Sequence, residues 1–114
     1  MPNQEFASKV LNNLKLVKKK YKSVQYFRKN RLLFTIWLII MDHYFNNKNN
    51  SIENIYREVN NFEKIARMTL SKYLNNAKEY GYLEYEKINK KEWNIKPTEL
   101  TLKEYNEWID TYKF

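Results

Sequence analysis

The chain has 114 residues, which allows one domain with a modest core. Hydrophobic residues make up 43% of it and aromatic residues 17%, a composition too apolar for a disordered chain. The absence of cysteine excludes a disulfide framework, a thiolate metal site and a cysteine nucleophile, and it agrees with the cytoplasmic location that we expect.

The net charge of +8 comes from the N-terminal part of the chain. Residues 1–32 carry nine lysines and arginines against Glu5 alone, and the rest of the chain carries 12 residues of each sign. Such a cluster attracts polyanions through counterion release, whatever their sequence. Lys18, Lys19 and Lys20 suit DNA, RNA or an acidic partner equally well. We therefore distinguish a basic N-terminal helix or arm over residues 1–31 from residues 32–114, within a single compact domain overall.

Two helices are predicted in the first half of the chain. An amphipathic helix runs from about residue 3 to 26, with lysines opposite its apolar face, and a second helix runs from about 29 to 45. Residues 32–41 are apolar nearly all round, which predicts a buried helix. These ten residues fall short of the roughly 20 that span a bilayer, so we expect no membrane element. His43, the only histidine, is expected to pack at the helix end.

A third helix is predicted over residues 51–60. Ser51 is its expected N-cap, and Ile52, Ile55, Tyr56 and Val59 form its inner face. Residues 60–62 then form a loop that separates this helix from the next one, and we expect Phe62 to fill the core beneath this loop.

Residues 65–85 are the most informative stretch. Ile65, Leu70, Leu74 and Ala77 fall at helical spacings and form one apolar face. Gly81, the only glycine, stands where a helix needs a left-handed residue after its C-terminus. Residues 82–85 then alternate like a half-buried strand. The pattern predicts a helix over 65–80 that turns directly into a hairpin, as a recognition helix precedes its wing.

The side chains off this apolar face carry donors for phosphates or base edges. They are Arg67, Thr69, Ser71, Lys72, Asn75 and Asn76. Arg67 is expected to contact guanine or a phosphate, and Lys72 a phosphate. Thr69 either contacts DNA or caps the helix, and a cap can also hold a phosphate. Asn75 and Asn76 either read adenine or are simply solvated.

The predicted strands cover residues 82–88 and 93–95, joined by residues 89–92. Lys90 and Lys91 at the tip suit phosphate or minor-groove contact, although a charged tip also discourages edge pairing. Pro97 cannot donate to a ladder, so the second strand is an edge there or has already ended.

The tyrosines and tryptophans are expected in the core and at an interface. For Tyr80, Tyr82 and Tyr85 around the hairpin, stacking on single strands is the alternative.

A last helix is predicted to begin at Thr101, which forms a capping box with Glu104, or one turn earlier at Thr98. Its apolar face would hold Leu102, Tyr105, Ile109 and Tyr112. One glycine, one histidine and no cysteine leave no phosphate loop, thiol nucleophile or acid–base pair. We therefore expect no enzyme, no catalytic residues, no cofactor and no metal site.

Residues 65–85, the hairpin and the Leu100-Thr101 pair together resemble the MarR family of winged-helix transcriptional regulators, over about residues 32–112. The resemblance implies an α+β, mostly α fold: a winged helix-turn-helix with a two-stranded β-hairpin wing and flanking N- and C-terminal helices. It also implies a homodimer held by those helices, with the recognition helix in the major groove and the wing near the minor groove. The chain departs from the family in three ways: a long connection before the recognition helix, Asn89-Lys90-Lys91 at the wing in place of the usual Asp and Arg, and a short C-terminal helix.

We therefore predict sequence-specific binding of double-stranded DNA by a small, repressor-like transcriptional regulator. Helix 65–80 would read a half-site while the wing and the N-terminal lysines contact phosphates. The alternative is a winged-helix protein-interaction module, binding a protein partner through its aromatic surface, or a replication-initiator-type protein. In that case the basic N-terminus would bind nucleic acid without sequence preference.

Overall fold

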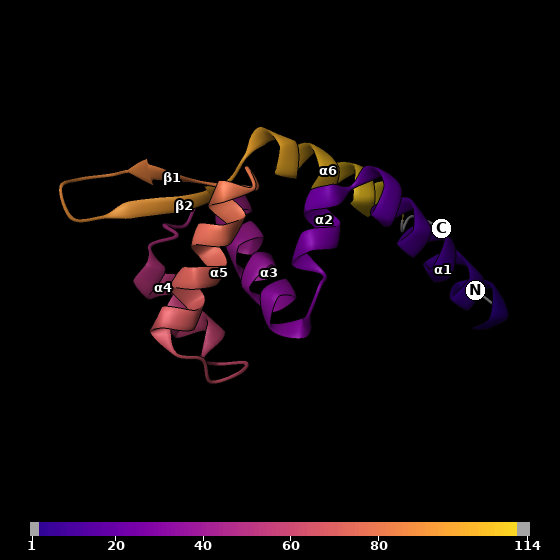
Figure 1. Ribbon diagram of the computed structural model, residues 1–114, viewed down its shortest axis with the longest axis horizontal. Coiled ribbons are helices and arrows are strands. Elements are labelled where there is room, and N and C mark those ends of the chain that lie inside the picture. Colours follow the sequence, from indigo (N-terminus) through magenta and orange to yellow (C-terminus); the bar gives the residue numbers. More distant parts are fainter. Residues whose placement is uncertain (1–2, 112–114) are drawn as a thin grey trace.

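The computed structural model describes residues 3–111 of the chain, which form six helices and one two-stranded antiparallel sheet. The protein is therefore α+β and mostly helical (Figure 1). In chain order the elements are α1 (Asn3–Lys20), α2 (Lys22–Phe27), α3 (Arg31–Phe45), α4 (Ile52–Val59), α5 (Arg67–Glu79), β1 (Leu83–Lys87), β2 (Trp93–Pro97) and α6 (Glu99–Asp110). None of these helices is long and apolar enough to cross a membrane.

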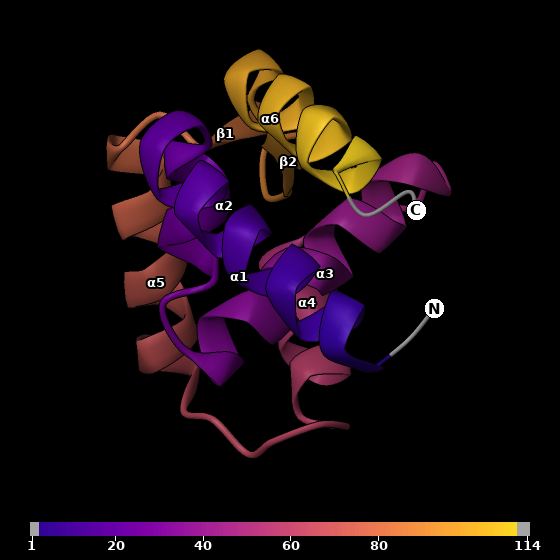
Figure 2. The same ribbon diagram turned by 90° about the vertical axis from the view of Figure 1, so that its right-hand side faces the viewer.

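The hairpin of β1 and β2 and the helix α1 project from opposite ends of the molecule. The molecule measures 52 × 29 × 24 Å, and these two elements lie at the two ends of its longest axis (Figure 1). Viewed along that axis, α5 forms one side of the molecule and α6 lies across the top (Figure 2). The basic N-terminal segment and the hairpin tip are therefore far apart.

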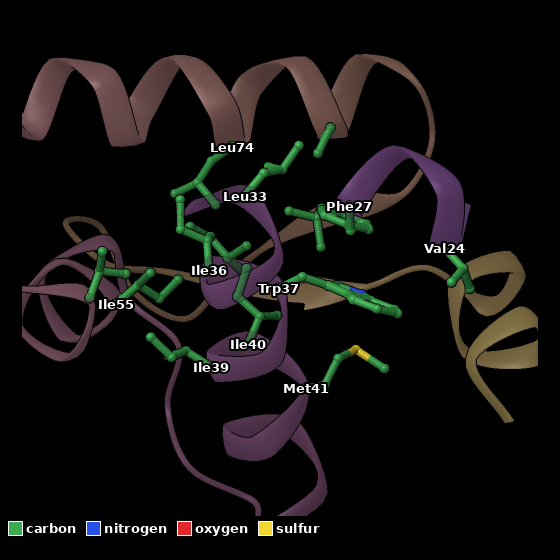
Figure 3. Close-up of a cluster of buried hydrophobic side chains, with 14 of the residues drawn as sticks. Val24, Phe27, Leu33, Ile36, Trp37, Ile39, Ile40, Met41, Ile55 and Leu74 are labelled. Atoms are coloured by element: carbon green, nitrogen blue, oxygen red, sulfur yellow. The ribbon is translucent and has the colours of Figure 1, made fainter. Parts of the chain in front are cut away.

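Helix α3 is the centre of the core, as its apolar sequence predicts. Trp37 is fully buried and stacks on Phe27 of α2, with ring centroids 5.1 Å apart and planes 2° from parallel. Leu74 of α5 and Ile55 of α4 approach α3 from its other sides (Figure 3). The buried residues of α3 are Leu33, Ile36, Trp37, Ile39, Ile40, Met41 and His43.

The single helix predicted over residues 3–26 is interrupted at Tyr21. Helix α1 ends at Lys20 and α2 begins at Lys22, because Tyr21 leaves the helical region with φ −116° and ψ 72°. This break leaves N–H groups at the start of α2 without partners in the helix. Glu104 of α6 accepts hydrogen bonds from the Ser23 N–H (2.9 Å) and the Ser23 hydroxyl (2.6 Å). A carboxylate 81 residues away thus acts as the cap of α2, which local sequence patterns do not reveal.

The predicted capping box at the C-terminal helix is wrong, and the alternative cap is right. Thr98 is the N-cap of α6, and its side chain accepts from the Thr101 N–H. Thr101 is buried inside the helix, where its hydroxyl donates to the Tyr82 carbonyl oxygen at 2.7 Å. Glu104 binds Ser23 instead of the helix N-terminus.

The apolar face of α6 also differs in part from the prediction. Leu102 and Tyr105 pack on the core as expected, but Ile109 is exposed and its neighbour Trp108 is buried. The Trp108 indole N–H donates to Asn13 Oδ1 of α1 at 3.1 Å, and this contact turns the tryptophan inward. Tyr112 lies outside the described residues.

Helix α4 begins as predicted, whereas the loop after it differs from the prediction. Ser51 caps α4 by accepting from the Asn54 N–H at 3.2 Å. In the loop, Phe62 is 64% exposed, so the prediction that it fills the core is wrong. The Phe62 and Glu63 N–H groups both donate to the Val59 carbonyl oxygen, and this tight turn carries the ring outward. Ile65 provides the buried contact instead.

The hairpin is tied to the loop that precedes α4. Strand β2 continues to Pro97, which pairs with Leu83 at the sheet edge, two residues beyond the predicted end. On its other edge the Ile95 N–H donates to the Asn50 carbonyl oxygen at 3.0 Å. Asn50 is buried, and its Oδ1 lies 2.8 Å from His43 Nδ1 at the end of α3. These bonds orient the hairpin relative to α3.

Candidate nucleic-acid interface

Helix α5 is oriented by its buried side and ended by Gly81. Leu70, Leu74 and Ala77 are buried, as their spacing predicts. Gly81 has φ +82°; its N–H donates to the Lys78 carbonyl oxygen and the Tyr82 N–H to that of Ala77. This is the Schellman arrangement, which ends the helix and turns the chain into β1.

The N-terminal end of α5 differs from the prediction. The helix begins at Arg67, two residues later than expected, and Ala66 occupies the N-cap position without a side-chain hydrogen bond. Thr69 is exposed in the first turn, inside the helix. It is therefore not the N-cap, and of its two predicted roles only the DNA contact stays a prediction.

The outer face of α5 carries an exposed stripe opposite the buried residues. Met68, Lys72, Asn75 and Glu79 are exposed and recur at helical spacing, so they lie along one line of the helix surface. Two of the predicted contacts, Lys72 and Asn75, belong to this stripe. Two others, Ser71 and Asn76, are half-buried at its sides. Met68 has no hydrogen-bond donor and is therefore absent from the predicted contacts, although its position one helical turn before Lys72 indicates the exposed face.

Arg67 is paired with a carboxylate of the neighbouring helix. Its guanidinium forms an ion pair with Glu53 of α4, and the two side chains are 54% and 55% exposed. Exposed ion pairs contribute only about 0–1 kcal/mol, so a phosphate group can replace Glu53 at little cost. In the free protein this pair draws Arg67 towards α4 and away from the stripe.

Asn75 is connected to the hairpin by Tyr85. The Tyr85 hydroxyl donates to Asn75 Oδ1 at 3.0 Å, which leaves both N–H donors of the amide for an outside acceptor. Burial raises the pKa of Tyr85 to about 12, so this hydroxyl stays a donor at pH values where an exposed tyrosine has lost its proton.

Asparagine also organises the hairpin tip. Asn89 Oδ1 accepts from the N–H groups of Lys91 and Glu92, both at 2.9 Å, which fixes the turn that presents Lys90 and Lys91. Within residues 3–111 the side chains of Lys72, Lys90 and Lys91 form no ion pair. Lys96, by contrast, is bound to Glu86 at 2.9 Å.

A cleft of about 470 Å³ lies between the hairpin, α4 and the start of α5. Its lining includes Arg67, Lys91 and Arg57, together with Trp93 and Glu53. The fold therefore brings the predicted residues Arg67 and Lys91 to one concave surface and adds Arg57, which sequence analysis passed over. Arg57 stands one helical turn after Glu53, on the outer side of α4, and this spacing was the available signal.

The lysines of the basic arm lie elsewhere. Lys18, Lys19 and Lys20 are exposed at the end of α1, on the far side of the molecule from the hairpin tip (Figure 1). The candidate interface and the main source of net charge are therefore separate surfaces. Among the described residues, no three His, Asp or Glu side chains gather as a metal site requires.

Comparison with protein-family models gives no match for this chain, and comparison with curated protein sequences gives none either.

Proposed function

We propose that this protein is a winged-helix transcriptional regulator that binds double-stranded DNA sequence-specifically. The observation that carries the proposal is the exposed stripe of α5, opposite the buried Leu70 and Leu74 and next to a hairpin with cationic residues at its tip. A helix about 10–12 Å across with its side chains fits the major groove, which is about 12 Å wide.

In this proposal each cationic or polar group has a separate task. Lys72 contacts a phosphate, and the Asn75 amide donates to a base edge or a phosphate. Arg67 exchanges Glu53 for a DNA phosphate or guanine. Lys90 and Lys91 at the tip of the wing follow the adjacent backbone, while the α1 lysines raise the local concentration of DNA without reading it. Thr69, Ser71 and Asn76 flank the contact.

We further propose that the protein acts as a cytoplasmic homodimer that represses by covering a promoter. The support is the apolar surface of α1, where Phe6, Leu11 and Leu14 are exposed on a helix that projects from the body (Figure 1). An exposed apolar surface of this kind marks an interaction site. Two copies joined there would match the two half-sites of a pseudo-palindrome.

The test is selection of duplexes from a random pool, followed by titration of the selected and the random duplex at about 150 mM salt, where counterion effects are reduced. We expect the selected duplex to bind at least about tenfold more tightly. Lys72→Glu should weaken its binding by about tenfold or more. Lys103→Glu, an equal charge reversal at an exposed position of α6, should leave it within about twofold. Equal affinity for both duplexes would refute the proposal.

One observation favours the interaction-module alternative. A cavity of about 310 Å³ between α3 and the loop after α4 is lined by the exposed side chains of Leu38 and Phe62 together with Ile39. An apolar site of this size accepts an apolar side chain of a partner protein. Under this alternative Phe62→Ser would abolish partner binding, whereas Lys72→Glu would have no effect on function. An initiator-type protein would instead bind replication-origin DNA, which a titration with such a duplex distinguishes.

A further inference from the structure

Met68 is the most exposed large apolar side chain of the described residues. It is 85% exposed, although it stands in the first turn of a helix whose other apolar side chains point to the core. Burying a methionine side chain is favourable, and the free protein leaves this gain unused. The side chain therefore contributes little to the fold and is accessible to a contact outside the chain.

The neighbours of Met68 leave it open to such a contact. Lys72 and Asn75 follow it at i+4 and i+7 on the same line of the helix surface. Arg67 is held towards α4 by Glu53, so its long side chain does not cover the methionine. The proposed interface therefore has an apolar group at the N-terminal end of α5, the end from which recognition helices reach base edges.

We propose that Met68 determines specificity by packing against the 5-methyl group of thymine in the major groove. This inference rests on the proposed function, because it assumes that α5 enters that groove. Among the groups that base pairs present there, the thymine methyl is the apolar one, and all the others donate or accept hydrogen bonds. The unbranched, polarisable side chain of methionine adapts to such an irregular contact. Together with the amide donors of Asn75, Met68 would make the protein prefer a thymine at a defined position of the half-site.

The experiment uses the duplex that the wild-type protein selects from a random pool. Each thymine is replaced in turn by deoxyuridine, which lacks only the 5-methyl group, and affinities are measured for wild type and Met68→Ala. We expect one position in each half-site at which the wild type loses roughly fourfold in affinity, the value of one buried methyl-sized group. Met68→Ala should bind the unmodified duplex more weakly and be indifferent to deoxyuridine at that position.

Two controls make the result specific. Leu100→Ala removes an exposed apolar side chain from α6 and should retain the wild-type response to deoxyuridine. Thermal unfolding of Met68→Ala should match that of the wild type, since the side chain is exposed.

Three results would overturn the inference. Wild-type affinity that is unchanged by deoxyuridine at every thymine would mean that no methyl group is contacted. Equal losses in wild type and Met68→Ala would assign the contact to another residue. Both of these leave the proposed function standing, whereas a pool without a preferred sequence would overturn the proposed function and this inference with it.

Discussion

Glu104 and Thr101 show how two side chains of one helix join three parts of the molecule. Glu104 is buried on α6 and accepts two hydrogen bonds from Ser23 at the start of α2. Hydrogen bonds to a charged group are worth about 1.5–3 kcal/mol, more than those between neutral groups. One turn earlier on α6, Thr101 donates to the Tyr82 carbonyl oxygen just before β1. These two residues hold α6 against both α2 and the hairpin.

We expect Glu104→Ala to lower the free energy of unfolding by about 2–3 kcal/mol, because it leaves the buried Ser23 N–H and hydroxyl without an acceptor. The measurement is urea denaturation followed by circular dichroism. Glu107→Ala, on the exposed side of the same helix, is the matched control and should change stability by less than about 0.5 kcal/mol. Equal effects of the two substitutions would contradict the capping role of Glu104.

Gly81 is a second position where one residue decides a local structure. Its φ of +82° is unfavourable for residues with a Cβ atom, while a Cβ added there would meet nothing within 4 Å. Gly81→Ala should therefore cost about 1–2 kcal/mol from backbone strain alone. Gly81→Asn should cost less, since asparagine tolerates this conformation. Thermal unfolding checks both, and an alanine variant as stable as the wild type would refute the explanation.

At the scale of elements, α5 and β1 are joined by the turn at Gly81 and by the bond from Tyr85 to Asn75. The turn alone permits rotation of the hairpin about its base. The second contact, from Tyr85 in the middle of β1, restrains this rotation. Holding α5 and the hairpin in one geometry is a requirement for a surface that contacts DNA through both.

The Tyr85 hydroxyl should make the free energy of unfolding depend on pH in the alkaline range. Its pKa of about 12 lies above the ordinary value of 10.0, so the folded protein keeps this proton after the unfolded chain has lost it. The free energy of unfolding should therefore fall as the pH rises from about 10 to about 12. Tyr85→Phe lacks this titration, so the difference in stability between wild type and variant should shrink across that range. A difference that stays constant from pH 9 to pH 12 in thermal unfolding would contradict the burial of this hydroxyl.

At the scale of the whole molecule, the excess positive charge and the hairpin lie in different regions. The +8 excess belongs to residues 1–32, of which residues 3–32 form α1, α2 and the start of α3, while the hairpin lies at the other end of a 52 Å axis (Figure 1). The Debye length is about 8 Å at physiological ionic strength, so these charges act at the hairpin only weakly. Under the proposed function the two regions would therefore make separate contributions to DNA binding.

This separation predicts different effects for one triplet and one pair of lysines. Replacing Lys18, Lys19 and Lys20 by glutamine should weaken binding to selected and random duplexes alike and lower the salt dependence of binding. Lys90→Gln with Lys91→Gln should weaken binding to the selected duplex more than binding to the random duplex, because the bond from Tyr85 to Asn75 restrains the hairpin relative to α5. Titrations at two salt concentrations measure both effects. A loss of sequence preference in the Lys18–Lys20 variant would show that α1 takes part in reading DNA.

The sequence by itself determined the features that depend on neighbours along the chain. The buried α3, the inner face of α5, the cap at Ser51 and the left-handed Gly81 all follow from apolar spacing or from the conformational limits of one residue. The exposed Lys72 and Asn75 follow as the complement of that inner face. Short-range hydrogen bonds and periodic burial act the same way wherever the segment lies, so they are visible without the fold.

Only the tertiary structure decided the features that depend on distant partners. Glu104 caps α2 after the helix break at Tyr21, Thr98 caps α6 while Thr101 binds the Tyr82 carbonyl oxygen, and Arg67 forms an ion pair with Glu53. In each case the observed arrangement is accompanied by a hydrogen bond or an ion pair to a residue that lies far away in the sequence. Such partners are separated by many residues and have no periodic signature, which is why the sequence leaves them open.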